Sequence, residues 1–186
     1  GTFWEHYRGD WDIVNGDRFP SGIGALGEYV HAHGMKFGVW CEIEGLGEKA
    51  QVAIDHPEYV ALRDGKRIGY VCFGNPAVQE WAYQTLAHII KDFGADWIKL
   101  DSNFDPEAGC NRTDHGHGAG DGLYEHIAGY YKVIERIHRD FPEVVPQNCS
   151  SGGLRIDLGM MQRTAMAFLS DPDWAVHDLQ IFWGAS

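Results

Sequence analysis

The stretch Ala95-Asp96-Trp97-Ile98-Lys99-Leu100-Asp101-Ser102-Asn103 decides the fold of this sequence. It is an apolar run of β-favouring residues that contains one lysine, Lys99, and stops at an aspartate, Asp101. A buried parallel strand reads as such a run, and α/β folds place their chemistry at the carboxyl end of the strand. A lysine inside the run needs a partner, and Asp101 points to the same side of the strand. These residues fit either an ion pair that caps a strand or a catalytic centre.

Helical and strand patterns alternate on both sides of this stretch. Strands of one series are predicted at 35–40, 97–100, 144–148 and 165–169. Helices are predicted at about 23–33, 77–93, 122–140, 155–162 and 173–185. A further short strand is expected at 70–73, with a hairpin or loop tip at Asp64-Gly65. The alternation implies parallel strands that are joined by right-handed crossovers.

Each strand of the series is followed by a chemically useful side chain. The residues at these strand ends are Glu42 and Glu44, then Asp101, then Cys149, then Asp171. Four polar strand ends on the same edge of a parallel sheet fit the active face of a (β/α)-barrel. An open doubly wound sheet is the alternative, but the glycine-rich phosphate-binding loop typical of that fold does not follow the first strand. A full barrel needs roughly 250 residues. We therefore expect residues 1–186 to form a single-domain fragment of an α/β barrel, a partial TIM barrel.

Composition excludes several classes of partner. The net charge of −12 argues against nucleic acid and against an anionic membrane surface. No run of about 18 apolar residues is present, so no membrane span is expected. The four cysteines are widely spaced and form no C-x-x-C pair. Reduced thiols are the default for such spacing, which weakly favours a cytoplasmic location.

Asp101 and Asp171 are the natural pair for acid–base and nucleophilic chemistry. Glycoside hydrolysis needs two carboxyl groups that flank the scissile bond. If Asp101 is the nucleophile, a nearby cation such as Lys99 could hold it ionised, or Lys99 could bind sugar hydroxyls. Asp171 must then keep a proton near neutral pH, in surroundings that Phe168 and Trp174 could supply.

Four motifs occur in order at these strand ends: 40–44 (WCEIE), 98–103 (IKLDSN), 149–160 (CSSGGLRIDLGM) and 170–171 (SD). They resemble the W-x-E-P-E, K-W-D-M-N, C-S-G-G-G-R-x-D-x-G-M and S-D-N-T-D segments of the glycoside hydrolase family 36 α-galactosidases. The resemblance implies roughly strands 3–6 of a (β/α)8 barrel, with their helices. It also implies a retaining glycosidase that cleaves terminal α-galactosides of oligosaccharides or glycoconjugates through a covalent glycosyl-enzyme.

Residue roles follow from the same resemblance. Asp101 is implied to attack the anomeric carbon, and Asp171 is implied to protonate the leaving group and then to activate water. The residues implied to line the galactose pocket are Trp40, Arg67, Lys99, Asn103, Cys149 and Gly152. No metal and no cofactor is implied. Substitutions in the motifs, such as Leu100 in place of tryptophan, alter the pocket wall and affect the expected substrate more than the reaction.

Alternative functions stay open at this point. Within the enzyme class they are an α-N-acetylgalactosaminidase or a galactosyl transferase similar to raffinose synthase. From another class, the alternative is a catalytically silent carbohydrate-binding relative, although binding alone does not require both aspartates. The full-length protein could form a homo-oligomer, and the isolated fragment is expected to be poorly active because it exposes two sheet edges.

Several side chains have competing interpretations. Asp173 is the rival of Asp171 as acid–base, although its position favours a helix N-terminus. Glu44 is expected to give structural support, and Arg155 is expected to pair with Asp157.

The long segment 104–121 has two possible interpretations, a metal site or a mobile loop. Its Cys110, His115 and His117 are residue types that bind metals. The glycines among them give no fixed ligand geometry and no helical spacing. The sequence therefore favours a mobile loop with incidental histidines.

Overall fold

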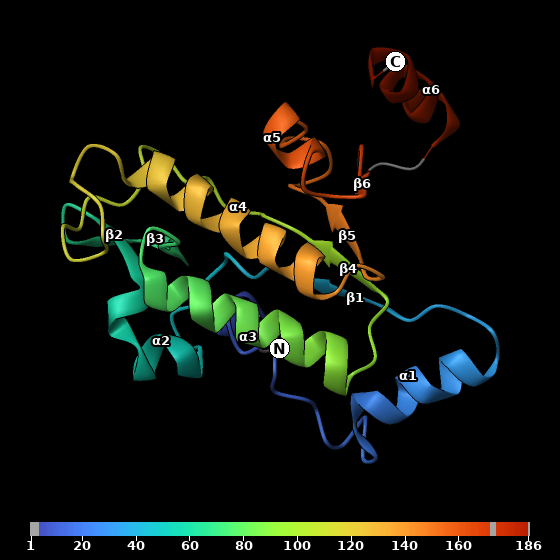
Figure 1. Ribbon diagram of the computed structural model, residues 1–186. Helices are drawn as coiled ribbons and strands as arrows, with labels where there is room; N and C mark the ends of the chain where they lie inside the picture. The colour runs from blue at the N-terminus through green and yellow to red at the C-terminus, as the bar shows by residue number, and fades with distance from the viewer. Residues whose placement is uncertain (1–3, 172–173, 186) are drawn as a thin grey trace.

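The protein is built around a four-stranded parallel sheet with the order β1-β4-β5-β6. The computed structural model describes residues 4–171 and 174–185. The strands are β1 (Gly38–Cys41), β4 (Trp97–Leu100), β5 (Val145–Asn148) and β6 (Met166–Ala167). Each lies within a stretch that the sequence predicts as a strand, except that β1 extends one residue further. The chain therefore has the alternating α/β order expected of a barrel (Figure 1).

Helices connect the strands and cover the sheet. The longer ones are α1 (Gly22–Ala32), α3 (Pro76–Asp92), α4 (Gly122–Asp140) and α6 (Ala175–Ala185), and the shorter ones are η1 (Trp4–Tyr7), α2 (Gln51–Asp55), η2 (Pro57–Tyr59) and α5 (Leu158–Met161). Helices α3 and α4 pack side by side against the sheet (Figure 1). Apolar side chains of both helices join Ile98 and Leu100 of β4 in one buried core. Burial of these apolar faces holds the layers together.

Local signals set the ends of α3. Asn75 precedes the helix, and its side-chain oxygen accepts a hydrogen bond from the Ala77 amide at 3.0 Å. Pro76 occupies the first helical position, where its missing N–H costs nothing. Gly94, with a φ of +72°, follows the helix and turns the chain into β4. Sequence signals of this kind explain why the helix lies within a residue of its predicted bounds.

An antiparallel hairpin lies outside the main sheet. It joins β2 (Val60–Arg63) to β3 (Lys66–Val71) through Asp64 and Gly65, whose φ angles are 52° and 76°. Positive φ at both central residues is typical of a tight hairpin turn, so the predicted hairpin tip is confirmed. The short strand predicted at 70–73 is part of this hairpin, and only residues 70–71 of it are β-strand.

The strand register aligns the carboxyl ends of the main sheet. Cys41, Leu100, Asn148 and Ala167 are successive partners across the four strands. The residues that follow each strand therefore emerge at one edge. In the described part of the chain, β1 and β6 each have one paired side, so the sheet has two open edges.

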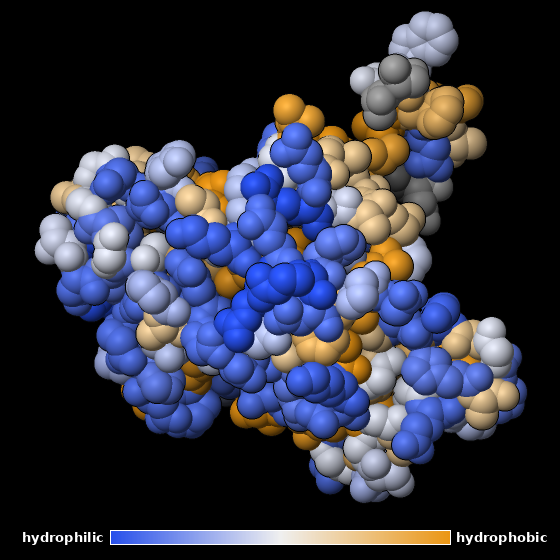
Figure 2. All heavy atoms as spheres, in the orientation of Figure 1, coloured by the Kyte–Doolittle hydropathy of each residue, from blue (hydrophilic) through white to orange (hydrophobic). Residues whose placement is uncertain are grey.

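The surface differs between the two ends of the fold. Figure 2 shows hydrophilic residues over α3 and α4 and more hydrophobic ones around α6. The exposed apolar side chains of that end are Trp174, Val176, Leu179, Phe182 and Trp183. Within the described residues, none of the helices has the length and apolar character needed to cross a bilayer.

Candidate active site

Asp101 follows β4 and is held by hydrogen bonds from three strand ends. The indole Nε1 of Trp40 donates to its Oδ2 at 2.9 Å. The backbone amides of Ser102 and Ser151 donate to its Oδ1 at 2.8 Å and 3.3 Å. Only 7% of Asp101 is exposed. The carboxylate is therefore fixed in position at the edge where β1, β4 and β5 end.

The surroundings of Asp101 keep it ionised. Burial by itself would raise the pKa of this carboxyl group. Hydrogen bonds from Trp40, Cys149, Asn103 and the Ser102 amide outweigh that effect and hold the pKa below its usual range. An ionised, oriented carboxylate is the state that a nucleophile needs.

Lys99 does not form the ion pair with Asp101 that the sequence suggests. Its ammonium lies 3.5 Å from the centre of the Phe168 ring, a cation–π contact. Among the described residues, no nitrogen–oxygen pair within 4.0 Å joins Lys99 to Asp101. Hydrogen-bond donors, and not this cation, account for the ionised state of Asp101.

Cys149 follows β5 and lies beside Asp101. Its side chain is buried, and burial together with the hydrogen bond to Asp101 raises the pKa of the thiol to about 11. A thiol with a raised pKa is a poor nucleophile at neutral pH. This environment suits a small buried group that donates to Asp101.

A glycine turn after Cys149 brings the next strand end close. Gly152 has a φ of +83°, and a Cβ at this position would lie 3.0 Å from the amide nitrogen of Asp171. The same turn contains Ser151, whose amide contacts Asp101. The backbone at Asp171 and the carboxylate of Asp101 therefore both lie next to this short turn. Asp171 is exposed at this edge.

Glu42 and Asn103 contact each other and the residues next to Asp101. The Asn103 amide donates to Glu42 Oε1 at 2.5 Å, and Arg8 Nε lies 3.1 Å from Glu42 Oε2. The side-chain oxygen of Asn103 accepts a hydrogen bond from Ser151 Oγ at 2.8 Å. Burial raises the pKa of Glu42, and Arg8 and Asn103 offset part of that rise. These contacts fix the loop that starts at Asp101.

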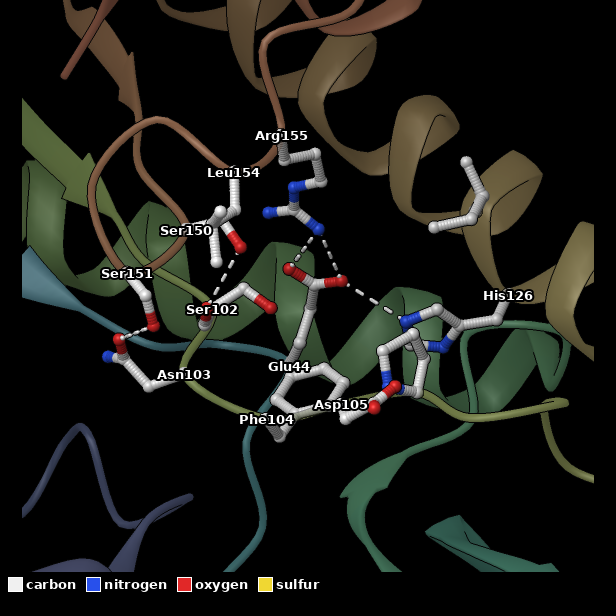
Figure 3. Close-up of a pocket in the computed structure, with 12 residues that line it drawn as sticks. Glu44, Ser102, Asn103, Phe104, Asp105, His126, Ser150, Ser151, Leu154 and Arg155 are labelled. Carbon is white, nitrogen blue, oxygen red and sulfur yellow. Dashed lines mark hydrogen bonds and ion pairs between the residues drawn. The ribbon is translucent and has the colours of Figure 1, made fainter. Parts of the chain in front are cut away.

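A cavity of about 490 Å³ opens next to this cluster (Figure 3). Its lining residues are Glu44, Ser102, Asn103, Phe104, Asp105, Pro106, His126, Ile127, Ser150, Ser151, Leu154 and Arg155. Several of these are neighbours or partners of Asp101, which is not itself a lining residue. The cavity is large enough for a small polar ligand.

A buried ionic cluster forms one wall of this cavity. Arg155 Nη1 lies 2.8 Å from Glu44 Oε2, and His126 Nε2 lies 3.1 Å from Glu44 Oε1 (Figure 3). Burial would raise the pKa of Glu44, but Arg155 and His126 hold it below the usual range. The expected pair of Arg155 with Asp157 is wrong: Asp157 caps α5 by accepting from the Met160 amide at 3.0 Å.

The predicted site residues fall into two groups. The structure gathers Trp40, Asn103, Cys149 and Gly152 around Asp101 and the backbone of Asp171, with Lys99 on the neighbouring Phe168. Arg67 lies apart on β3, is exposed, and donates to the Gly47 carbonyl at 3.4 Å. The rival Asp173 lies outside the described residues.

Sequence reasoning missed some of the lining residues. His126 reaches the cavity from the second turn of α4, and nothing in the sequence separates it from other helical polar residues. Ser151 acts through its backbone amide, which every residue carries. Only the glycines beside Ser151 signalled a tight turn at this position.

The loop over 104–121 also differs from expectation. His115 and His117 are 1% and 7% exposed, and Cys110 is fully buried. The loop therefore buries Cys110 and both histidines, which the sequence did not predict. A loop whose polar side chains are buried must hold them in fixed contacts.

Parallel strands that alternate with helices and carry oriented carboxylates at one edge define the class of (β/α)8-barrel catalytic domains, here in partial form. A protein-family model described as Melibiase matches residues 5–186, and the chain belongs to this family. The resemblance to glycoside hydrolase family 36 α-galactosidases is thereby confirmed.

The similar proteins are α-galactosidases. Alpha-galactosidase Mel36A of Lactobacillus acidophilus is 28% identical over 184 residues, which are 96% of this chain and 25% of the relative. Alpha-galactosidase 1 of Pediococcus pentosaceus is 30% identical, with the same coverage. The crystal structure of the α-galactosidase from Lactobacillus brevis has a TM-score of 0.88 and 27% identity, over 100% of this chain and 26% of that one.

These comparisons confirm the partial barrel. The structural match to the Lactobacillus brevis protein extends over the whole chain. The chain spans about a quarter of the length of the relatives that it matches.

Proposed function

We propose that the protein that carries this chain is a retaining α-galactosidase-type glycoside hydrolase. The observation that carries the proposal is the environment of Asp101: a buried carboxylate with three backbone and indole donors, kept ionised at the carboxyl end of β4. A carboxylate oriented in this way is prepared to attack an electrophilic carbon. We also infer that residues 1–186 form one domain, a fragment of the catalytic barrel.

The reaction proceeds by double displacement. A carboxylate oxygen of Asp101 bonds to the anomeric carbon while the bond from that carbon to the leaving oxygen breaks. Asp171 gives its proton to the leaving oxygen and then removes a proton from the water that attacks the glycosyl-enzyme. Retention of configuration requires the two carboxyl groups to lie roughly 5–5.5 Å apart. The glycine turn that contacts Asp171 supports this proximity.

Most of the proposed substrate contacts lie at the same edge, where the strands of the parallel sheet end. Trp40 is 38% exposed and donates to Asp101, so its exposed part can pack on a sugar bound beside that carboxylate. Asn103, Cys149, Lys99 and Gly152 surround the same carboxylate or its neighbours. For Arg67, the proposed sugar contact rests on the sequence motif alone. Structures of a Geobacillus stearothermophilus α-galactosidase in complex with stachyose and with raffinose support α-galactoside oligosaccharides as the substrate class.

The Asp101→Gly variant of the full-length protein tests the nucleophile. Hydrolysis of an aryl α-galactoside should fall by at least about a thousandfold, because the covalent step is lost. Azide should restore turnover and give the β-galactosyl azide, since it enters from the face that Asp101 occupied. Asp92→Asn, on the exposed end of α3, is the control and should keep wild-type rates. Wild-type-like activity of Asp101→Gly would refute the assignment.

A second pair of variants tests Asp171. In Asp171→Ala, substrates with good leaving groups should keep their first step, whereas substrates with poor leaving groups should lose it. Asp178→Asn, an exposed carboxylate in the first turn of α6, is the matched control. An equal loss for both substrate types would assign the acid–base role elsewhere, with Asp173 the next variant to make.

A substrate panel distinguishes the related activities. Rates on aryl α-galactoside and aryl α-N-acetylgalactosaminide separate the two glycosidases. Products formed from raffinose with and without an added sugar acceptor separate hydrolysis from galactosyl transfer. Sugar binding without turnover of any of these substrates would identify a silent binding relative.

A further inference from the structure

Four side chains of metal-binding type form a buried cluster that the active site does not use. One potential ligand atom from each of Cys72, Cys110, His115 and His117 lies within 4.8 Å of the other three. Cys72 Sγ lies 3.2 Å from His117 Nε2, and Cys110 Sγ lies 3.6 Å from His115 Nδ1. All four residues are buried. The cluster joins the turn after β3 to the loop between β4 and α4.

We propose that these four side chains bind one zinc ion as a closed structural site. Zinc binds tetrahedrally at about 2.3 Å from sulfur and about 2.0–2.1 Å from imidazole nitrogen, which puts neighbouring sulfur and nitrogen ligands roughly 3.5 Å apart. The two sulfur–nitrogen distances of the cluster, 3.2 Å and 3.6 Å, bracket this value. Two thiolates also neutralise the charge of Zn²⁺, so the buried centre carries no net charge. A set of two sulfur and two nitrogen ligands in a tetrahedral site selects zinc.

The hydrogen bonding of His117 presents one nitrogen for coordination. Its Nδ1 lies 2.8 Å from the carbonyl oxygen of Gly118. A carbonyl only accepts, so Nδ1 carries the proton and Nε2 presents its lone pair toward Cys72. Metal-binding histidines commonly donate their second N–H to a backbone carbonyl in this way. The contact fixes both the tautomer and the orientation of the ring.

The glycines around the histidines give the site its geometry. Gly116, between His115 and His117, has a φ of +80°, a conformation that L side chains rarely adopt. A Cβ on Gly74 would lie 2.4 Å from Cδ2 of His117. Both glycines therefore allow the two imidazoles to approach the cysteines. The spacing of these residues in the sequence does not show this approach.

The ion would anchor the loop that begins at the catalytic edge. The same loop lines the cavity at Phe104 and Pro106, and Tyr70 stacks on Phe104 with ring centres 4.7 Å apart. Tyr70 Oη donates to the Pro106 carbonyl at 3.3 Å. The far part of this loop holds Cys110 and the histidines. Zinc would thus fix the loop at one end while its other end forms the cavity wall.

Metal content of the full-length protein, purified under reducing conditions with zinc present, tests the proposal directly. Elemental analysis should find one zinc per chain in the wild type. Cys110→Ser and His117→Gln should each retain roughly a tenth of that or less, because one ligand is lost. His138→Gln, an exposed histidine on α4, is the matched control and should keep the zinc.

Wild-type measurements keep the proposal falsifiable if the variants fail to fold. Cobalt substituted for zinc should show thiolate-to-metal charge transfer and the intense visible bands of a tetrahedral site. Zinc removal by a chelator should increase the reaction rate of the two thiols. Wild-type protein without bound metal would overturn the proposal, whether mass spectrometry finds a Cys72–Cys110 disulfide or two free thiols. None of these readouts depends on glycosidase activity, so the site and the proposed function can fail separately.

Discussion

At Asp101, burial and hydrogen bonding act on the carboxyl pKa in opposite directions. Removal from water favours the protonated form, whereas donors aimed at both oxygens favour the anion. The donors prevail, so the carboxylate is ionised above a pKa that lies below the usual range for aspartate. As pH falls through that pKa, Asp101 gains a proton and loses its nucleophilic character. If Asp101 governs the loss of activity in acid, the midpoint of that loss should lie below the ordinary aspartate pKa.

The Trp40→Phe variant should move that midpoint. Loss of the indole donor to Asp101 should raise the carboxyl pKa, since a hydrogen bond to the charged form favours that form. The pH profile of kcat/KM measures the shift. Trp11→Phe is the control, because Trp11 packs on Trp40 with ring centres 5.5 Å apart and its indole N–H has no hydrogen-bond partner among the described residues. An unmoved midpoint in Trp40→Phe, or an equal shift in both variants, would contradict this account.

The Arg155→Met variant should lose stability. It leaves Glu44 buried with His126 as its remaining ionic partner, and breaking a buried ion pair costs about 3–5 kcal/mol. Chemical denaturation at neutral pH measures the loss. Arg136→Met, which breaks surface pairs with Glu80 and Asp140, should cost about 1 kcal/mol or less.

The loss should also depend on pH. The native pKa of Glu44 is lowered, so its ionic stabilisation is fully present above the ordinary glutamate pKa and is lost as pH falls through the native value. The difference between wild type and Arg155→Met should therefore shrink in acid. A difference that is constant from neutral to acid pH would exclude this mechanism.

At the scale of elements, the register of the parallel strands assembles the site. Because Cys41, Leu100 and Asn148 are aligned, the next residues of each strand emerge together as Glu42, Asp101 and Cys149. Hydrogen bonds from the loops after β4 and β5 then hold Glu42 and Asp101 in place. The turn at Gly152 lies close to the end of β6, since a Cβ there would crowd the Asp171 amide.

Gly152→Ala should lower kcat substantially and reduce stability by about 1–2 kcal/mol, because alanine at positive φ is strained and its Cβ displaces the backbone at Asp171. Steady-state kinetics and thermal unfolding measure the two effects. Gly120→Ala is the matched control, because its Cβ would meet open space and its φ is not in the left-handed region. Unchanged kinetics in Gly152→Ala would show that the turn does not position Asp171.

At the scale of the whole molecule, the fold is incomplete as a barrel. The described strands leave β1 and β6 each with an open edge, and the apolar side chains of α6 are exposed, including Phe182 at 69%. A closed barrel pairs all strand edges and covers its helices with neighbours. The coverage of about a quarter of each relative agrees with this arrangement.

Residues 1–186 expressed alone should associate or bind a hydrophobic dye, and should turn over aryl α-galactosides at least about a hundredfold more slowly than the full-length protein. Open strand edges and exposed apolar surface are the cause. Size-exclusion chromatography, dye fluorescence and kinetics measure the three effects. Full activity of a monomeric fragment would contradict the assignment of 1–186 as part of a larger barrel.

The sequence alone determined the alternation of the main helices and strands, the bounds of the longer helices to within about two residues, and the order of Asp101 and Asp171 along the chain. Hydrophobic periodicity, proline and glycine signals are local, so they can be read without a structure. Only the tertiary structure decided which partners each buried group meets. Lys99 packs on Phe168, Arg155 pairs with Glu44, and Cys72 meets the histidines of a distant loop. Such contacts join residues far apart in the chain, and no local pattern encodes them.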